Sequence, residues 1–189
     1  MTEPVDKINL TGLTRQEIEK AIVDMGEKPF RSRQLFSWIY EKNAADFAQM
    51  TNLSKSLRQK LDTLCTIGHL RLQEKQISPQ SGSTKYLFSL HDGHLIESVY
   101  IPENDRRTLC ISSQVGCALR CRFCATGRLG FSRNLSAGEI VDQVLAIERD
   151  QGIELSNVVF MGMGEPFMNT DAVLKAAALI NHPEIIGPL

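Results

Sequence analysis

The sequence lacks several features that would place it in a specialised class of protein. It has no apolar run long enough to span a bilayer, and its first ten residues lack the basic start, apolar stretch and cleavage site of a secretory signal. It also has no excess of either charge, since 21 Lys and Arg residues stand against 22 Asp and Glu residues. We therefore expect a cytoplasmic protein with no membrane partner, in which any nucleic-acid contact comes from local basic clusters.

Cysteine is scarce, and its distribution is uneven. The chain has five cysteines in 189 residues; Cys110, Cys117, Cys121 and Cys124 fall within one short segment, and Cys65 stands alone. Because disulfides are rare in the cytoplasm, the grouped cysteines are better explained as ligands or catalysts than as structural bridges. Cys65 matches no such role, so we expect it in the core.

The first 66 residues predict a small helical unit. Thr14 and Glu17 form a capping box at the start of one helix, where each side chain can pair with the other residue's backbone. A second helix is expected over 31–40, and leucines at helical spacing predict a third over 53–64. These apolar stripes indicate packing in a core.

Residues 67–102 change to the pattern of an antiparallel element. Apolar residues alternate along 84–90, and Asp92 followed by Gly93 is typical of a hairpin turn. Residues 95–101 predict the second strand of the hairpin. We expect this antiparallel linker to join the helical unit to the last part of the chain.

The last part of the chain, residues 103–189, alternates strands and helices. The expected elements are a strand over 108–112, a helix opened by the capping box of Ser136 and Glu139, a strand over 157–161 and a helix over 171–180. Such βα units predict an α/β fold with a parallel sheet, whose active sites lie at the carboxyl ends of the strands. Two units do not close a barrel, so we expect a truncated one.

Three cysteines follow the first strand of this region at the spacing Cys117-x-x-x-Cys121-x-x-Cys124. Four-iron clusters are usually held by four cysteine thiolates, so three thiolates leave one iron free to bind a small molecule. A structural zinc site with Cys110 as fourth ligand is the alternative, although zinc cysteines usually come in two closely spaced pairs. The spacing favours an iron–sulfur cluster and leaves zinc open.

The turn after the second strand allows a more specific interpretation of the cysteine loop. The three-cysteine loop after the first strand of a βα array resembles the signature of the radical S-adenosylmethionine (SAM) enzymes. Gly162-Met-Gly-Glu165-Pro166 resembles their second motif, which binds the amino group of SAM. Alone, such a turn is more often a plain strand-to-helix connection. A glutamate carboxylate nevertheless suits an ammonium group, and glycines let the backbone approach a ligand closely.

Longer stretches resemble one family of these enzymes, the bacterial dual-specificity RNA adenine-C2 methyltransferases of the RlmN type. The similar segments, spread over nearly the whole chain, are residues 96–102, 108–117, 124–127, 130–131, 133–135 and 158–166. The resemblance implies a helix-hairpin-helix-like RNA-binding domain over 1–66. It also implies the first part of a radical SAM barrel over 103–189.

The resemblance further implies a reaction and the residues that perform it. Cys117, Cys121 and Cys124 would hold a 4Fe-4S cluster, and Gly164 and Glu165 would bind SAM. One-electron cleavage of SAM would give a 5′-deoxyadenosyl radical, which is needed because C2 of adenine is not nucleophilic. The methyl group would pass through a methylated cysteine of the enzyme to C2 of adenosine in 23S rRNA and certain tRNAs.

Two further residues gain roles through the resemblance alone. Cys110 matches the cysteine that resolves the protein–RNA adduct through a transient disulfide, and Glu97 matches the proton acceptor. Without it, both would be ordinary strand residues. The resemblance also implies an electron donor such as flavodoxin, and we expect a monomer. The family's methyl-carrying cysteine lies near its C-terminus, beyond this sequence, so we expect no turnover from the 189-residue chain alone.

A local basic cluster supports an RNA partner. Residues 106–133 contain six arginines and no acidic residue; the arginines are Arg106, Arg107, Arg120, Arg122, Arg128 and Arg133. Such clustering suits contacts with phosphates, although scattered arginines on a solvated loop would look the same. Two alternatives remain: a zinc-stabilised RNA-binding module without catalysis, and a related radical SAM enzyme that methylates another adenine carbon.

Overall fold

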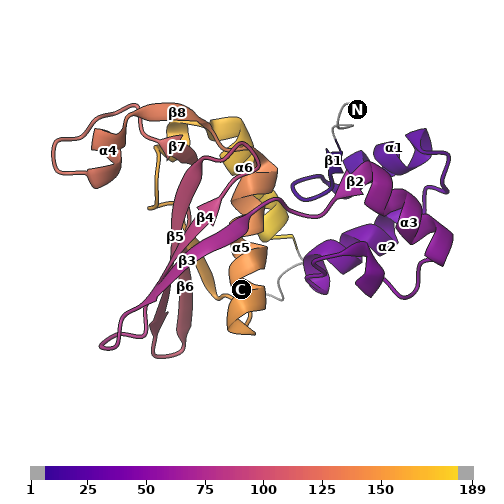
Figure 1. The fold of residues 1–189 in the computed structure, drawn as a ribbon, viewed down its shortest axis with the longest axis horizontal. Coiled ribbons are helices and arrows are strands. Elements are labelled where there is room, and N and C mark those ends of the chain that lie inside the picture. Colours follow the sequence, from indigo (N-terminus) through magenta and orange to yellow (C-terminus); the bar gives the residue numbers. More distant parts are fainter. Residues whose placement is uncertain (1–6, 183–189) are drawn as a thin grey trace.

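The computed structural model describes residues 7–182, in which a helical unit lies beside a larger α/β unit (Figure 1). The expectations for residues 1–6, and for the end of the chain at 187–189, lie outside the described residues. Within the described residues, no helix is both long enough and apolar enough to cross a bilayer.

The helical unit is built from three helices and two shorter helical segments. These are α1 (Arg15–Asp24), α2 (Arg31–Phe36) with its π-helical continuation η1 (Ser37–Glu41), the 3-10 helix η2 (Phe47–Gln49) and α3 (Lys55–Leu64). The capping box predicted for Thr14 and Glu17 is present at α1. Two short parallel strands, β1 (Ile8–Asn9) and β2 (Cys65–Thr66), bring the two ends of the unit together. Cys65 is buried, as predicted.

The α/β unit is organised around one five-stranded sheet of order β3-β4-β5-β6-β9. Its strands are β3 (Arg71–Ile77), β4 (Thr84–Ser89), β5 (Leu95–Glu103), β6 (Arg106–Cys110) and β9 (Asn157–Val159). Parallel pairing occurs only between β6 and β9, and the other neighbours are antiparallel. The sheet is therefore mixed, because the two-residue connection from β5 to β6 allows only a hairpin.

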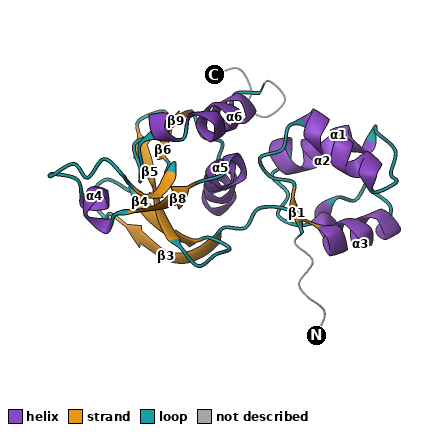
Figure 2. Cartoon of the chain, turned by 90° about the horizontal axis from the view of Figure 1, so that it is seen from above, coloured by secondary structure: helices purple, strands orange, loops and turns teal. Residues whose placement is uncertain are grey.

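Among the described residues, the two longest helices of this unit lie on one face of the sheet (Figure 2). The long helix α5 (Ala137–Gln151) and α6 (Thr170–Ile180) pack on that face, where Tyr86, Ile96 and Leu109 are fully buried. The capping box predicted for Ser136 and Glu139 is present at α5. Residues on the opposite face, such as Glu97, Val99 and Cys110, are only half-buried. This open face of the sheet lies beside the candidate site.

The cysteine loop rises from a small hairpin at the carboxyl end of β6. Strands β7 (Gln114–Gly116) and β8 (Phe131–Asn134) form the hairpin, and the short helix α4 (Ala125–Leu129) lies within the loop. In Figure 1 this loop projects from the end of the sheet far from the helical unit.

The helical unit docks on the first turns of α5. Gly12 approaches the backbone of Gly138 so closely that a side chain on either residue would collide with the other segment. Asp142 on α5 accepts hydrogen bonds from the backbone N–H groups of His69 (2.8 Å) and Leu70 (3.0 Å), just after β2. These contacts fix the position of the helical unit relative to the sheet.

Candidate active site

The glycine turn and the segment that leads into the cysteine loop meet at the carboxyl edge of β6 and β9. The N–H of Gly162 donates to the carbonyl of Ile111 (3.0 Å), and the N–H of Ser113 donates to the carbonyl of Met163 (2.8 Å). The turn after β9 therefore lies along the segment that leads from β6 into the cysteine loop. This is the sheet edge at which the sequence predicts an active site.

The close approach of these segments explains both glycines of the turn. A Cβ atom on Gly162 would lie 2.6 Å from the carbonyl oxygen of Ile111. Gly164 has φ +99°, and a Cβ atom there would lie 2.5 Å from the Cβ of Gln114. Both distances are shorter than non-bonded atoms tolerate, so any larger residue would push the two segments apart.

Glu165 is held in place by both its backbone and its side chain. Its N–H donates to Oε1 of Gln114 (2.9 Å), and its own Oε1 accepts from the N–H of Phe167 (3.1 Å). The second contact caps the 3-10 helix η3 (Pro166–Met168). The residue is half-buried, and within residues 7–182 its carboxylate forms no ion pair with a cationic side chain. A carboxylate in this position suits a ligand ammonium group.

The three cysteines of the loop occupy different environments. Cys117 is buried at the loop's base, where its N–H donates to the carbonyl of Gly130 (2.8 Å), whereas Cys121 and Cys124 are half-buried. Backbone N–H groups of Gly127 and Thr126, together with the Thr126 hydroxyl, point at the Cys124 sulfur and lower its pKa. A lowered pKa favours the thiolate, which is the form that binds metals.

All five cysteines are free thiols, and three of them share this one loop. Within residues 7–182, no three His, Cys, Asp or Glu side chains are gathered as a ready-made metal site. The fit to a cluster therefore rests on the donor set, three free thiols on one loop, one of them with a lowered pKa.

Cys110 differs from the loop cysteines. It sits at the end of β6, opposite Val99 in the sheet, and burial raises the pKa of its thiol. A thiol with a raised pKa forms the thiolate less readily and is therefore a poorer metal ligand. This environment disfavours Cys110 as a fourth zinc ligand, although the ligand set itself stays a prediction.

Glu97 lies on the same open face of the sheet as Cys110. It is on β5, two residues before Val99, and strand residues two apart point to the same side. Its carboxylate pairs with Lys85 on β4 at 3.0 Å, and both side chains are about two-fifths exposed. Glu97 and Cys110 thus share one accessible surface.

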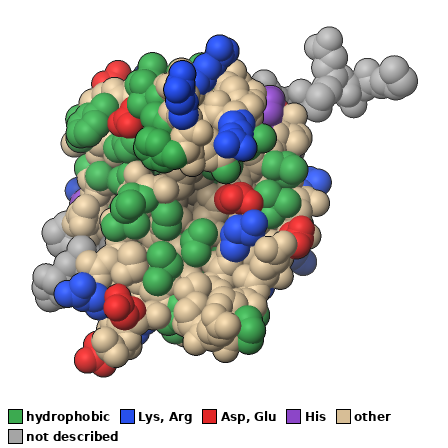
Figure 3. All heavy atoms as spheres, turned by 90° about the vertical axis from the view of Figure 1, so that its left-hand side faces the viewer, with side chains coloured by type: hydrophobic (Ala, Val, Ile, Leu, Met, Phe, Trp, Pro, Cys, Tyr) green, Lys and Arg blue, Asp and Glu red, His purple; other side chains and the backbone are tan. Residues whose placement is uncertain are grey.

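The six arginines of the basic cluster separate in the structure. Arg106 and Arg107 begin β6, so they lie at the opposite end of that strand from the cysteine loop. Arg120, Arg122 and Arg128 are exposed on the loop itself. Figure 3 shows this side of the molecule, where hydrophobic side chains spread between basic ones. A single arginine patch, as the sequence suggested, is not formed.

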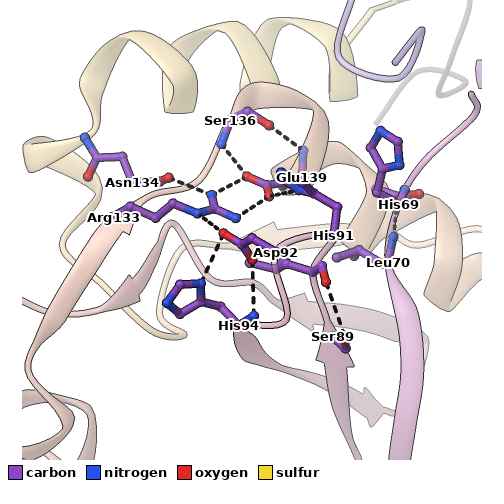
Figure 4. Close-up of polar contacts among 12 residues, drawn as sticks. His69, Leu70, Ser89, His91, Asp92, His94, Arg133, Asn134, Ser136 and Glu139 are labelled. Carbon is purple, nitrogen blue, oxygen red and sulfur yellow. Dashed lines mark hydrogen bonds and ion pairs between the residues drawn. The ribbon is translucent and has the colours of Figure 1, made fainter. Parts of the chain in front are cut away.

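Arg133 is engaged within the protein (Figure 4). Its Nε donates to Asp92 (2.6 Å), and its two terminal nitrogens donate to the two carboxylate oxygens of Glu139 (2.9 and 2.7 Å). Arg133 thereby ties β8, the strand that ends the cysteine loop, to α5 and to the turn between β4 and β5. Its guanidinium is therefore better explained as an anchor for this loop than as a phosphate contact.

The structure also shows site residues that sequence reasoning missed. Ser112, Gln114, Gln143 and Asn169 are buried polar residues whose side chains hold the two motif segments in place. No periodic pattern marks them, because their neighbours come from distant parts of the chain. The run of three polar residues 112–114 at the end of an apolar strand was the only available signal.

Comparison with known proteins agrees with this geometry. A family model described as the radical SAM superfamily matches residues 111–187, and one described as the ribosomal RNA large subunit methyltransferase N-terminal domain matches residues 8–67. The part of the chain that carries the cysteine loop and the glycine turn is thus similar to a radical SAM domain.

Individual relatives are similar to this chain over nearly its whole length. A dual-specificity RNA methyltransferase RlmN from Geobacter sulfurreducens is 47% identical over 177 residues, covering 94% of this chain and 48% of the relative. One from Geotalea uraniireducens is 46% identical over 95% of this chain and 52% of its own length. A crystal structure of a radical SAM methyltransferase from Sphaerobacter thermophilus is 41% identical with a TM-score of 0.88, covering 94% of this chain and 53% of that one.

The chain is similar to the RlmN-type radical SAM methyltransferases over nearly all of its length. It spans about half the length of the curated relatives that it matches.

Proposed function

We propose that this chain forms the cluster-binding and SAM-binding part of a methyltransferase that acts on C2 of adenosine in 23S rRNA and certain tRNAs. The observation that carries the proposal is the contact between the two motif segments. The Gly162–Glu165 turn is hydrogen-bonded to the segment that opens the cysteine loop, so both halves of one site lie at one sheet edge. Similarity to the RlmN-type methyltransferases supports the same conclusion.

The cysteine loop and the glycine turn have separate roles in this proposal. Cys117, Cys121 and Cys124 would hold a 4Fe-4S cluster, which when bound supplies the single electron for cleavage of SAM. Glu165 accepts hydrogen bonds from the ligand's ammonium group, and Gly164 lets the backbone come close enough for that contact. Phe167 N–H keeps the Glu165 carboxylate oriented.

The open face of the sheet carries the remaining chemistry. Burial raises the pKa of Cys110, and we assign to it the release of the product through a transient disulfide with the methylated cysteine of the full-length enzyme. Glu97 accepts a proton on the same accessible face, where its carboxylate forms an ion pair with Lys85. We assign these roles to the full-length enzyme.

RNA is the proposed macromolecular partner, with residues 1–66 as an accessory RNA-binding domain, 67–102 as an antiparallel linker and 103–189 as the first part of the barrel. The boundary at 102 falls inside β5, because the linker strands continue into the barrel sheet. Exposed Arg120, Arg122 and Arg128 on the cysteine loop are suited to phosphate contacts. An electron donor such as flavodoxin, a monomeric state and a cytoplasmic location complete the proposal.

Metal analysis after anaerobic reconstitution tests this proposal against its zinc-binding alternative. We expect the chain to become brown and to take up iron and sulfide, and Cys121→Ala to lose most of both. Cys65→Ala is the matched control, because it removes a buried thiol far from the loop and should keep its iron. A colourless protein with one zinc per chain would instead identify a zinc-stabilised RNA-binding module.

A further inference from the structure

Three buried polar side chains lie beneath the meeting point of the two motif segments. Ser98 on β5, Ser112 after β6 and Gln143 on α5 are each at most 1% exposed. Burying polar groups is costly unless every donor and acceptor finds a partner. Their presence in an otherwise apolar layer therefore indicates a fixed arrangement.

Gln143 uses its whole side-chain amide. Its Oε1 accepts from the Ser98 hydroxyl (2.8 Å) and from the N–H of Ser112 (2.8 Å). Its Nε2 donates to the carbonyls of Ser112 (3.0 Å) and Glu139 (3.1 Å). The amide thus pairs with both backbone polar groups of Ser112, much as a neighbouring strand would.

Ser112, once held by Gln143, connects the two functional segments through its hydroxyl. The Oγ atom donates to the carbonyl of Glu97 (2.6 Å) and accepts from the N–H of Met163 (2.9 Å). Met163 is the central residue of the glycine turn, directly before Gly164 and Glu165. One hydroxyl therefore sets the distance between the strand that carries Glu97 and the turn that carries Glu165.

We propose that Ser112 is a positioning residue for SAM binding, and that Gln143 locks it in place. The inference deepens the proposed function and rests on it for the identity of the ligand. Without the Ser112 hydroxyl, the Met163 N–H and the Glu97 carbonyl lose their buried partner, so the turn loosens relative to Glu97. The cysteines begin beyond β7, and the hydrogen bonds of the Ser112 hydroxyl go to Glu97 and Met163, so cluster uptake should survive while SAM affinity falls.

Ser112→Ala and Ser98→Ala form a matched pair for testing this. Each variant removes one buried hydroxyl from a residue that is hydrogen-bonded to Gln143, Ser98 through its hydroxyl and Ser112 through its backbone. Of the two hydroxyls, only that of Ser112 contacts the turn. In the full chain without ligand, we expect the Met163 amide to exchange with deuterium about tenfold faster in Ser112→Ala and at the wild-type rate in Ser98→Ala.

In the reconstituted chain, the same pair separates cluster binding from SAM binding. We expect Ser112→Ala to keep wild-type iron and sulfide contents but to bind SAM about tenfold more weakly, as followed by the spectrum of the cluster. Ser98→Ala should match the wild type in both measurements. Equal SAM affinity in the two variants, or unchanged Met163 exchange in Ser112→Ala, would overturn the inference.

Two further outcomes are kept distinct. If the wild type takes up no cluster and no SAM, the proposed function fails and the SAM assignment falls with it, while Met163 exchange still decides whether Ser112 fixes the turn. If Ser112→Ala does not fold, Gln143→Glu replaces it, because it keeps the Ser112 hydroxyl but removes the donors to the Ser112 carbonyl. Met163 exchange should then rise about threefold; no change there would refute the positioning role.

Discussion

Arg133 anchors the cysteine loop through two carboxylates of unequal burial. Its partner Glu139 has a side chain only 5% exposed, whereas Asp92 is about a quarter exposed and also accepts from His94. Arg133→Gln would leave the Glu139 carboxylate buried beside a neutral group. We expect a loss of about 2 kcal/mol in the free energy of unfolding, measured with urea.

The control for Arg133 is the exposed pair of Lys175 and Glu17, at 2.8 Å with both side chains at least one third exposed. Lys175→Gln should cost less than about 0.5 kcal/mol, because solvent screens such pairs. If the two variants lost the same stability, the anchoring role of Arg133 would be wrong.

The same cluster predicts a pH dependence. Hydrogen bonds from Arg133 lower the pKa of Asp92; for Glu139 burial raises the pKa, but the Arg133 and Ser136 contacts outweigh it and the pKa is lowered. Carboxyls with lowered folded-state pKa values stabilise the protein at neutral pH, and this contribution is lost as the pH falls below about 4. Urea midpoints of the wild type should drop over that range, and those of Arg133→Gln should drop less.

Thiol reactivity distinguishes two cysteines in the cluster-free chain. The pKa of Cys124 is lowered by backbone N–H groups, while burial raises that of Cys110. Because the thiolate is the nucleophile, iodoacetamide at pH 7 should alkylate Cys124 at least about tenfold faster than Cys110. Peptide mass mapping at short times measures both rates in one sample, and faster labelling of Cys110 would contradict the assigned environments.

At the scale of elements, the turn after β9 is limited by packing as well as by backbone conformation. Gly164 and Gly93 both have positive φ, but only Gly164 faces a neighbouring side chain, and Gly93 has open space around it. Gly93→Ala should therefore lower the free energy of unfolding by about 1 kcal/mol, from backbone strain alone. Gly164→Ala should lower the free energy of unfolding by about 1–3 kcal/mol more, because the added Cβ would clash with Gln114. Equal costs in thermal unfolding would show that the turn is not packed on Gln114.

The sequence predicted elements best where the information is local. Capping boxes at Thr14 and Ser136 depend on residues three apart, and both are present. The strand β3 was missed because all of its residues are exposed, so no buried face gives it an alternating pattern. The antiparallel hairpin of β4 and β5 was predicted, but its continuation through β6 and β9 as one mixed sheet was missed, because strand pairing is decided by connections and distant partners.

In the candidate site, too, local motifs could be predicted from the sequence, whereas contacts between distant residues could not. The cysteine spacing and the glycine turn could be read from short segments, and the structure places the turn along the segment that leads into the cysteine loop. Ser112 and Gln143 are 31 residues apart, and nothing in either local sequence predicts their hydrogen bonds. Arg133 was misjudged for the same reason, since its partner Asp92 lies 41 residues earlier.

At the scale of the whole molecule, the two longest helices of the α/β unit lie on one face of the sheet, and the opposite face holds Glu97 and Cys110. The cysteine loop and glycine turn stand at one edge of it, while the helical unit docks on α5 at the covered side. A small ligand at the sheet edge and an RNA base on the open face would therefore lie next to each other. This arrangement suits a reaction that passes a radical from one to the other.

Electron paramagnetic resonance tests the central claim most directly, namely that the cysteine loop and the glycine turn form one site. The reconstituted full chain is reduced anaerobically and measured with and without SAM. We expect a reduced 4Fe-4S signal that changes shape when SAM is added, because three cysteine ligands leave one iron open. A signal that stays the same at saturating SAM, or a chain that binds zinc and no iron, would contradict it.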